Sequence, residues 1–242
     1  MTIIAKNEAD RIEGAIRSVA FADEIVVLDS GSTDGTPELA RRLGAVVVET
    51  DWPGHVAQKN RALEHVKNVW VLSIDADERV SLELGDAIRA ALERPDAVAF
   101  RVNRLSWWGG APLRHGTWHP DWRARLFQKE HARWGGRDPH DRLEADGPTR
   151  DLAGVLEHHP YRSLSDHLRT VGEYSRIASA RLAEEGAVAH WWDLAFRPPL
   201  HFAKAFLWKR GFLDGARGLI VATLGATQVL LKWGRLYLGV RE

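Results

Sequence analysis

The chain has 242 residues, of which 45% are hydrophobic and 27% charged, as in a typical soluble globular protein. It contains no cysteine, which excludes a disulfide framework and a thiolate metal site, and its formal net charge of zero argues against a general nucleic-acid-binding protein. No run of 18 apolar residues is present and the N-terminus lacks the apolar segment of a secretory signal. We therefore expect no membrane-spanning helix and a reaction in the cytoplasm.

Strand and helix patterns alternate over the first hundred residues. Short apolar or β-branched runs predict strands at TIIA, EIVVLD, AVVVE, VWVLSID and AVAFRV. Between them, Ile12, Ile16 and Val19 recur at the spacing of one helix face. This alternation predicts right-handed βαβ units and a parallel sheet.

Two further helices carry start signals in the sequence. Thr36 is expected to cap a helix that has Pro37 at its first position and Gly44 beyond its end. Ser81 is expected to cap the helix SLELGDAIRAAL. These signals place each predicted helix directly after a predicted strand.

Polar side chains follow the predicted strands at their carboxyl ends, where parallel sheets bind ligands. Asp75 and Asp77 in VLSIDADERVS are two residues apart, so on a strand they would face the same ligand. Carboxylate oxygens suit Mg²⁺ or Mn²⁺. The alternative is a solvated aspartate pair that forms a turn and caps the next helix. Glu78 points elsewhere in this register, and we expect it to belong to the following turn, paired with Arg79.

Two other residues of the first half carry candidate roles. Asp29 ends a strand in VVLDSGSTDGTPELA and could accept hydrogen bonds from a base or ribose, or it could serve only to build an Asx-type turn. Lys59 lies near the start of the helix GHVAQKNRAL, where anions are favoured, so it could meet a phosphate. The alternative for Lys59 is an ordinary exposed lysine.

The pattern changes between Asn103 and His159, where Trp, Gly, Pro, His and Arg dominate. ARLF reads as a strand, and we expect the rest to form loops around a site. The segments RHGTWHPDW, DPHD and EHHPYRS concentrate histidines, which are common metal ligands and bases, although any single one could be structural. The remainder of the chain reads as helical.

The C-terminal region is basic and rich in aromatic residues. From Arg197 onward there are eight Lys or Arg residues and two acidic ones, which leaves this tail with a charge of +6 and the rest of the chain with −6. A basic amphipathic segment is typical of an element that binds an anionic membrane surface. The alternative is a pair of helices that pack on the catalytic domain with their tryptophans in the core.

Taken together, these stretches resemble the family 2 glycosyltransferases. AKNEADRIEGAIRSV, EIVVLDSGSTDGTPELA, QKNRAL and WVLSIDADERVS fall in the order and spacing of that family. PDWRARLF, DPHDRL, HHPYRSLSDHL and RGFLDGARGLIVA are similar to the lipopolysaccharide core β-1,4-glucosyltransferase subgroup. The resemblance implies an α/β GT-A fold: a mostly parallel central sheet flanked by helices, with a helical C-terminal extension.

The domain organisation that follows has a catalytic domain over residues 1–160 and a helical region over 161–242, the latter a candidate for membrane association. Within the catalytic domain, 1–102 would bind the nucleotide sugar and 103–160 would face the acceptor. The resemblance implies that Glu8 and Asp29 line the uridine pocket and that Lys59 lies near the diphosphate or base. It places Asp75 at the ribose or at a metal-bound water.

The same resemblance implies the metal and the base. Asp77 would ligate a divalent ion, Mg²⁺ or Mn²⁺, and His158 would complete its binding. Asp141 would be the general base. The chain departs from the family pattern twice: Asp29 is followed by Ser30 where many relatives have a second aspartate, and Asp141 stands where relatives more often have glutamate.

The expected function is that of an inverting glycosyltransferase. It would move a sugar, glucose by the subgroup resemblance, from a UDP-sugar or similar donor to a hydroxyl of a lipopolysaccharide-core or other cell-envelope glycan, free or lipid-linked. Such an acceptor would place the enzyme at the inner face of the cytoplasmic membrane. One alternative is a nucleotidyltransferase, which is disfavoured because AKNEADR lacks a glycine-rich phosphate loop. The other is a non-catalytic nucleotide-sugar-binding protein, which would not need Asp77, Asp141 and His158 together.

Overall fold

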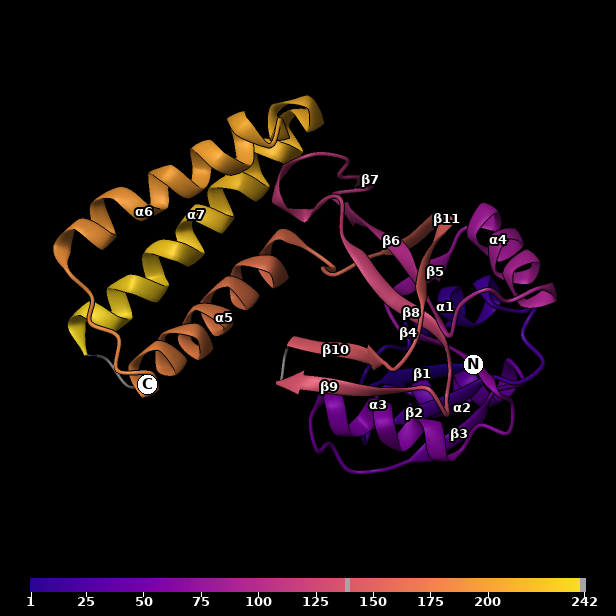
Figure 1. Ribbon diagram of the computed structural model, residues 1–242. Helices are drawn as coiled ribbons and strands as arrows, with labels where there is room; N and C mark the ends of the chain where they lie inside the picture. The colour runs from indigo at the N-terminus through magenta and orange to yellow at the C-terminus, as the bar shows by residue number, and fades with distance from the viewer. Residues whose placement is uncertain (138–139, 240–242) are drawn as a thin grey trace. The chain divides into compact units, whose positions relative to one another are not determined.

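The computed structural model describes residues 1–137 and 140–239 (Figure 1). The chain divides into two compact units. The first unit comprises Met1–Arg104 and Asp121–His158, and the second comprises Leu105–Pro120 and the described residues from His159 onward. The functional division predicted at residue 160 stays a prediction, because compact units need not coincide with functional domains.

Parallel strands open the sheet of the first unit. They are β1 (Thr2–Ala5), β2 (Val26–Asp29), β3 (Val46–Glu49) and β4 (Trp70–Asp75), and they lie in the order β3-β2-β1-β4. Ala5 pairs with Asp29 and Ile4 pairs with Asp75, so the strands end at one common edge. The predicted strands and their parallel pairing are confirmed, and the polar residues that follow them meet at that edge.

Helices follow the strands of this half of the unit. They are α1 (Ile12–Ser18), α2 (Thr36–Arg42), α3 (His55–Glu64) and, after the short strand β5 (Glu78–Val80), α4 (Leu82–Glu93). Ser81 caps α4 as predicted, since its Oγ accepts a hydrogen bond from the Leu84 N–H at 3.2 Å. The prediction for Thr36 was wrong: Gly35 is the N-cap of α2, and the Thr36 hydroxyl accepts a hydrogen bond from the Glu8 N–H instead.

The sheet continues through strands that are mostly antiparallel. Beyond β4 the order is β8 (Trp122–Gln128), β6 (Ala99–Trp108), β11 (Thr149–His158) and β5 (Glu78–Val80). A separate hairpin pairs β9 (Ala132–Arg137) with β10 (His140–Ala145). ARLF lies within β8 and AVAFRV overlaps β6, as predicted. The expectation of loops was wrong for β9, β10 and β11, where frequent Arg, Gly, Asp and Glu residues hide the apolar alternation.

Two clusters of buried side chains form the core of the first unit. Ile3 and Leu126 belong to one cluster, whereas their chain neighbours Ile4 and Phe127 belong to the other. Successive side chains of a strand point to opposite faces, so the two clusters occupy the two faces of the sheet. Both faces are buried, as is usual for a parallel sheet flanked by helices.

The second unit is built mainly from helices. They are α5 (Leu164–Glu184), α6 (Trp191–Ala203) and α7 (Gly215–Leu238), with short helical turns at η1 (Gly116–Trp118), η2 (Lys204–Trp208) and η3 (Gly211–Asp214). Strand β7 (Ala111–Pro112) pairs with the end of β6. Helix α7 packs against both α5 and α6 (Figure 1). Within the described residues, no helix is long and apolar enough to cross a membrane.

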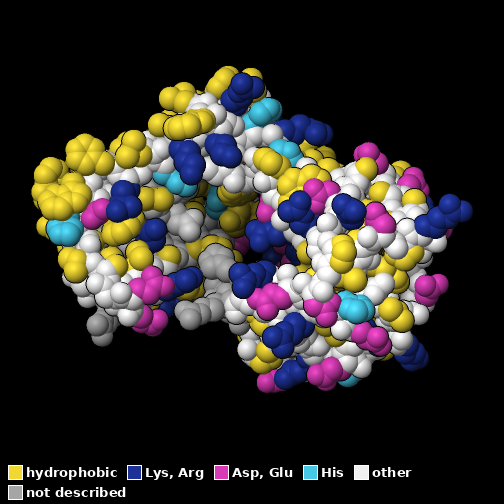
Figure 2. Space-filling model, viewed as in Figure 1, with side chains coloured by type: hydrophobic (Ala, Val, Ile, Leu, Met, Phe, Trp, Pro, Cys, Tyr) yellow, Lys and Arg dark blue, Asp and Glu magenta, His cyan; other side chains and the backbone are white. Residues whose placement is uncertain are grey.

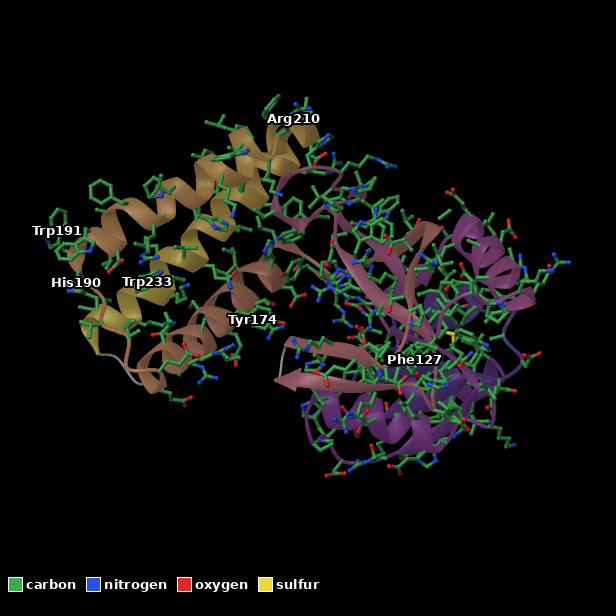
Figure 3. All side chains as sticks on the ribbon, in the orientation of Figure 1. Phe127, Tyr174, His190, Trp191, Arg210 and Trp233 are labelled. Atoms are coloured by element: carbon green, nitrogen blue, oxygen red, sulfur yellow. The ribbon has the colours of Figure 1, made fainter. Side chains whose placement is uncertain are left out.

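Hydrophobic side chains remain exposed over α6 and the turn that follows it (Figure 2). The exposed members are Trp191, Trp192, Phe196, Leu200, Leu207 and Trp208. Trp233 of α7 is instead covered by Arg197 of α6, whose guanidinium carbon lies 4.0 Å from the ring centroid (Figure 3). The tryptophans of this region thus divide between helix packing and the surface.

Candidate functional site

The loops after β1 and β2 are joined by hydrogen bonds. The Asn7 N–H donates to Ser32 Oγ, and the Thr33 N–H donates to Asn7 Oδ1, both at 2.8 Å. Asn7 has a φ of +55°, in the left-handed region that asparagine tolerates better than most residues. The Ala9 N–H donates to Asp34 Oδ2 at 3.0 Å. These bonds hold both loops in one arrangement at the sheet edge.

Asp29 and Glu8 both lie at this edge. The buried Asp29 carboxylate accepts from the Ser32 N–H at 2.8 Å and from the Ser32 hydroxyl, which is the turn-building arrangement. Glu8 is half-buried, and its Oε2 lies 3.8 Å from Arg11 Nε. The roles of Asp29 and Glu8 toward a nucleotide stay predictions.

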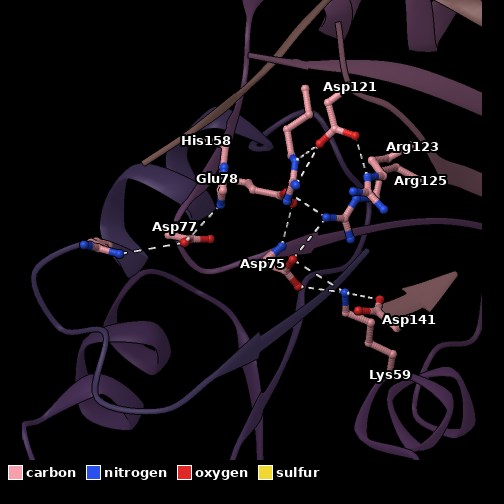
Figure 4. A network of polar contacts seen from close by, with 11 residues as sticks. Lys59, Asp75, Asp77, Glu78, Asp121, Arg123, Arg125, Asp141 and His158 are labelled. Atoms are coloured by element: carbon pink, nitrogen blue, oxygen red, sulfur yellow. Dashed lines mark hydrogen bonds and ion pairs between the residues drawn. The ribbon is translucent and has the colours of Figure 1, made fainter. Parts of the chain in front are cut away.

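Lys59 of α3 lies between two carboxylates (Figure 4). Its Nζ is 2.8 Å from Asp141 Oδ2 and 3.0 Å from Asp75 Oδ1, and it is 4.6 Å from the centroid of the Trp134 ring. The Lys59 side chain is only 2% exposed, so the alternative of an ordinary surface lysine is wrong. An ammonium buried this deeply requires such counter-ions.

Asp75 ends β4 and keeps a partly exposed carboxylate. Its Oδ2 accepts from Arg125 Nη2 at 3.0 Å, in addition to the contact with Lys59. Burial opposes the ionisation of Asp75, but Lys59 and Arg125 outweigh it and hold its pKa well below the ordinary value. Asp75 is therefore a carboxylate at neutral pH.

Glu78 is 0% exposed and belongs to the same network. Its Oε1 accepts from Arg125 Nη2 at 2.6 Å and from Arg104 Nη1 at 3.5 Å, and its Oε2 accepts from the Asp75 N–H at 2.9 Å. The expected pairing with Arg79 was wrong. Side chains alternate along β5, so Arg79 is exposed while Glu78 is buried.

The contacts continue to the other side of Glu78. Arg104 Nη2 lies 2.8 Å from Asp121 Oδ2, and Arg123 Nε donates to Asp121 Oδ1 at 2.7 Å. The result is a chain of alternating charges, whose members in order are Arg123, Asp121, Arg104, Glu78, Arg125, Asp75, Lys59 and Asp141. Its four positive and four negative charges cancel, so each buried charge has an oppositely charged neighbour.

Sequence reasoning missed Arg104, Arg125 and the burial of Glu78. One signal was present: WRARLF sets Arg123 and Arg125 on or directly before a predicted strand, and that strand, β8, lies beside β4 in the sheet. Two arginines on the inner strand next to β4 require acidic partners. The sequence could not say which carboxylates these partners are.

Asp77 lies apart from Asp75 in its contacts (Figure 4). Strand β4 ends at Asp75 and residues 76–77 form a turn, so the expectation that Asp75 and Asp77 share a strand face was wrong. Asp77 Oδ2 lies 3.5 Å from His158 Nε2 and 3.8 Å from Arg11 Nη1. His158 reaches this position because β11 pairs with β5 in a register that sets His158 opposite Glu78.

The pair of Asp77 and His158 fits a divalent ion in its chemistry. One carboxylate oxygen and one imidazole nitrogen, 3.5 Å apart, can face a single Mn²⁺ or Mg²⁺. Among residues 1–137 and 140–239, no group of three or more His, Cys, Asp or Glu side chains could hold a metal ion. An ion held by Asp77 and His158 would take its remaining ligands from substrate phosphates or water.

The chain is similar in sequence to known glycosyltransferases. Residues 2–145 match the family model described as Glycosyl transferase family 2. The chain is 31% identical over 254 residues to an uncharacterized glycosyltransferase of Rickettsia prowazekii (strain Madrid E), with 97% of this chain and 85% of the relative covered. It is 27% identical to the lipopolysaccharide core biosynthesis glycosyltransferase LpsC of Rhizobium meliloti (strain 1021), with coverages of 97% and 90%.

A solved structure also resembles the chain. The crystal structure of S. aureus TarS 1–349 superposes with a TM-score of 0.50 at 15% sequence identity, covering 95% of this chain and 80% of the 1–349 chain. This likeness concerns the fold. Together with the mixed, flanked sheet described above, it confirms the predicted GT-A fold.

Proposed function

Since the chain belongs to the family 2 glycosyltransferases, we propose that it is an inverting, metal-assisted enzyme that transfers a sugar from a UDP-sugar to a hydroxyl of a cell-envelope glycan. The observation that carries the proposal is the gathering of Asp75, Asp77, Asp141 and His158 within one compact unit, with Asp75 at the carboxyl end of β4. Ligands of open α/β sheets bind at that end of the strands.

On the donor side, Glu8 and Asp29 line the nucleoside pocket at the ends of β1 and β2, and Asp75 contacts the ribose or a metal-bound water. This assignment is supported by the common edge at which β1, β2 and β4 end. Lys59 links Asp75 to Asp141 and therefore joins the donor side of the site to the acceptor side.

Asp77 and His158 hold the divalent ion, Mg²⁺ or Mn²⁺. When bound, such an ion supplies Lewis-acid stabilisation of the negative charge on the departing diphosphate. The residues of this chain position it: the β11–β5 pairing sets His158, and the turn after β4 sets Asp77. Arg11 lies 3.8 Å from Asp77 and orients its carboxylate from the other side.

Asp141 is the general base. It takes the proton of the acceptor hydroxyl as that oxygen attacks the anomeric carbon, and the bond from that carbon to the diphosphate breaks. A single displacement of this kind inverts the anomeric centre, and a positioned base typically accelerates it about 10²–10⁴-fold. Lys59, at 2.8 Å, fixes the position of the Asp141 carboxylate.

For the acceptor, we propose a lipopolysaccharide-core or related envelope glycan, with glucose as the transferred sugar. The support is the similarity to LpsC, which is named a lipopolysaccharide core biosynthesis glycosyltransferase, over 97% of this chain. Specificity would depend on side chains of the second half of the chain, where the Trp- and His-rich segments lie.

We also propose that the second unit binds the anionic inner surface of the cytoplasmic membrane. Trp191, Phe196 and Leu200 are exposed along α6, and Trp208 is 82% exposed at the end of η2. The exposed cations Lys209 and Arg210 follow Trp208, and Figure 3 marks Trp191 and Arg210 near opposite ends of this segment. Apolar side chains flanked by cations suit an anionic lipid interface. Trp233 instead packs against Arg197 within the helices, as in the alternative of a packed helical pair. The region therefore combines tryptophans used for packing with tryptophans exposed for membrane binding.

Donor turnover tests the proposed function. The full chain is incubated with UDP-sugars, Mn²⁺ or Mg²⁺ and a lipid A–core acceptor, and the release of UDP is measured. We expect acceptor-dependent release that Asp77→Ala abolishes. A non-catalytic binding protein would bind UDP-sugar without releasing UDP, and a nucleotidyltransferase would instead form UDP-sugar from UTP and a sugar phosphate.

A further inference from the structure

Two buried residues of the alternating chain have no part in the reaction as proposed. Glu78 of β5 is 0% exposed and Arg125 of β8 is 4% exposed, so neither can contact substrate directly. Both nevertheless touch Asp75. Arg125 Nη2 lies 3.0 Å from Asp75 Oδ2 and 2.6 Å from Glu78 Oε1, so one nitrogen serves both carboxylates.

Asp75 is thereby held at two points. Arg125 binds its carboxylate, and the other oxygen of Glu78 accepts its backbone N–H at 2.9 Å. The second bond lies at the end of β4, where the ladder with β1 stops. Glu78 and Arg125 thus restrict both the backbone and the side-chain orientation of Asp75.

The buried ion pair of Glu78 and Arg125 is not well suited to stabilise the fold. Arg125 Nε and Nη1 are buried, and neither finds a hydrogen-bond acceptor among the described residues. Unsatisfied buried donors are costly, and a buried ion pair contributes little or no net stability compared with apolar side chains of similar size. The free-energy cost of burying these unsatisfied donors is consistent with a role other than stability, namely fixing the orientation of Asp75.

We propose that Glu78 and Arg125 are positioning residues that hold Asp75 in the orientation that binds the nucleotide-sugar donor. The inference rests on the proposed function, since it assumes that Asp75 contacts the donor. It assigns no direct substrate contact to either residue. Their effect on catalysis passes through Asp75.

Two variants separate positioning from folding. In Arg125→Lys, an ammonium on a flexible stem replaces the planar guanidinium, so the rigid geometry that fixes the nitrogen shared by the two carboxylates is lost. In the double variant Glu78→Met/Arg125→Met, apolar side chains of similar size replace the pair, which preserves net charge and leaves Asp75 with Lys59 alone. The matched control is Arg101→Lys, because Arg101 of β6, in the same sheet, binds Asp151 through two hydrogen bonds of 2.6 and 2.9 Å and both side chains are exposed.

The measurements are the donor KM and kcat from UDP release, UDP binding in the presence of Mn²⁺ by calorimetry, and the thermal midpoint. We expect the double variant to fold, and both variants to raise the donor KM and the UDP dissociation constant about 10-fold or more. The control should retain wild-type values. A raised KM at constant kcat is the signature of lost binding, whereas a merely structural role lowers the active fraction, and with it kcat, at constant KM.

A folded double variant with wild-type donor KM and UDP affinity would overturn the proposal. So would an Arg125→Lys variant that loses kcat without any change in KM. If the double variant fails to fold, Arg125→Lys alone decides between these outcomes. Failure of the proposed function is distinguishable, because the wild-type chain would then neither bind UDP with Mn²⁺ nor release it from any donor, and the inference would fall with it.

Discussion

Lys59 and Asp141 are 82 positions apart in the chain, yet Lys59 Nζ donates to Asp141 Oδ2 at 2.8 Å. Lys59 comes from α3 in the first half of the chain, and Asp141 comes from the hairpin strand β10. The same ammonium also contacts Asp75 at 3.0 Å. One buried cation therefore ties the proposed base to the proposed donor-binding carboxylate.

Replacement of Lys59 by methionine should destabilise the protein strongly. It would leave Asp75 and Asp141 without their shared cation in a largely buried site, and such a loss typically costs about 3–5 kcal/mol. Urea denaturation measures the free energy of unfolding. Lys67→Met, at an exposed position, is the control and should change it little. Equal stability of the two variants would contradict a structural role for the Lys59 contacts.

Asp141→Asn should lower kcat about 10²–10⁴-fold while the dissociation constant for UDP-sugar stays near the wild-type value. The reason is that asparagine keeps the size and the contact with Lys59 but cannot accept the acceptor proton. Steady-state UDP release gives kcat, and calorimetry gives the dissociation constant of the donor. Asp146→Asn, just beyond the exposed end of the same hairpin, serves as the control. A variant that loses donor affinity but retains kcat would show that Asp141 is not the base.

His158→Ala should raise the Mn²⁺ concentration for half-maximal activity about 10-fold or more, because it removes one of the two proposed protein ligands. Binding of Mn²⁺ in the presence of UDP, followed by calorimetry, gives a readout that does not depend on turnover. His131→Ala is the matched control, since His131 is an exposed histidine whose Nδ1 lies 2.9 Å from Asp146 Oδ1, away from the proposed metal site. Unchanged Mn²⁺ binding in His158→Ala would exclude His158 as a ligand.

Acidification should destabilise the second unit through His167. Burial lowers the pKa of His167 to about 4, and its Nδ1 accepts from Trp108 Nε1 at 3.1 Å, so the folded state holds a neutral ring. An unfolded histidine has a pKa of about 6.5, so between pH 6.5 and 4 the unfolded state binds the additional proton. The stability contribution is therefore present above pH 6.5 and is lost as the pH falls to about 4.

The measurement is the thermal midpoint over this pH range for the wild type and for His167→Gln, which can still accept from Trp108 but does not titrate. We expect the decrease with falling pH to be smaller in His167→Gln. His131→Gln, at an exposed position, should behave as the wild type. Identical pH profiles for the wild type and His167→Gln would contradict a buried neutral histidine.

Binding to anionic vesicles should depend on the exposed end of η2 and the cations that follow it. Trp208→Ser combined with Lys209→Gln and Arg210→Gln should weaken co-sedimentation with phosphatidylglycerol vesicles about 10-fold or more, and added salt should weaken wild-type binding. These point changes leave the packing of α7 on α5 and α6 in place, which a deletion would not. Trp52→Ser is the control at another exposed tryptophan. Full binding by the triple variant would refute the membrane proposal.

Several features followed from the sequence alone because they depend on residues close together in the chain. The apolar runs of β1 to β4 and the helical spacing of the segments between them are visible within short stretches of sequence. Ser81 likewise caps α4 through the N–H of Leu84, only three residues away. The positions of Asp29 and Asp75 at strand ends follow from the same runs. The motifs around these aspartates indicated family 2 of the glycosyltransferases, and the match of residues 2–145 to that family's model shows it.

The pairings within the site depended on contacts between distant segments. Asp77 meets His158 only because β11 pairs with β5 in one register, and Glu78 finds Arg125 only because β8 lies beside β4. A strand register or a buried ion pair is decided by the summed burial and hydrogen bonding of many residues. The sequence therefore predicted which residues carry the chemistry, and the tertiary structure decided that Asp75 is held by Lys59 and Arg125 while Asp77 faces His158.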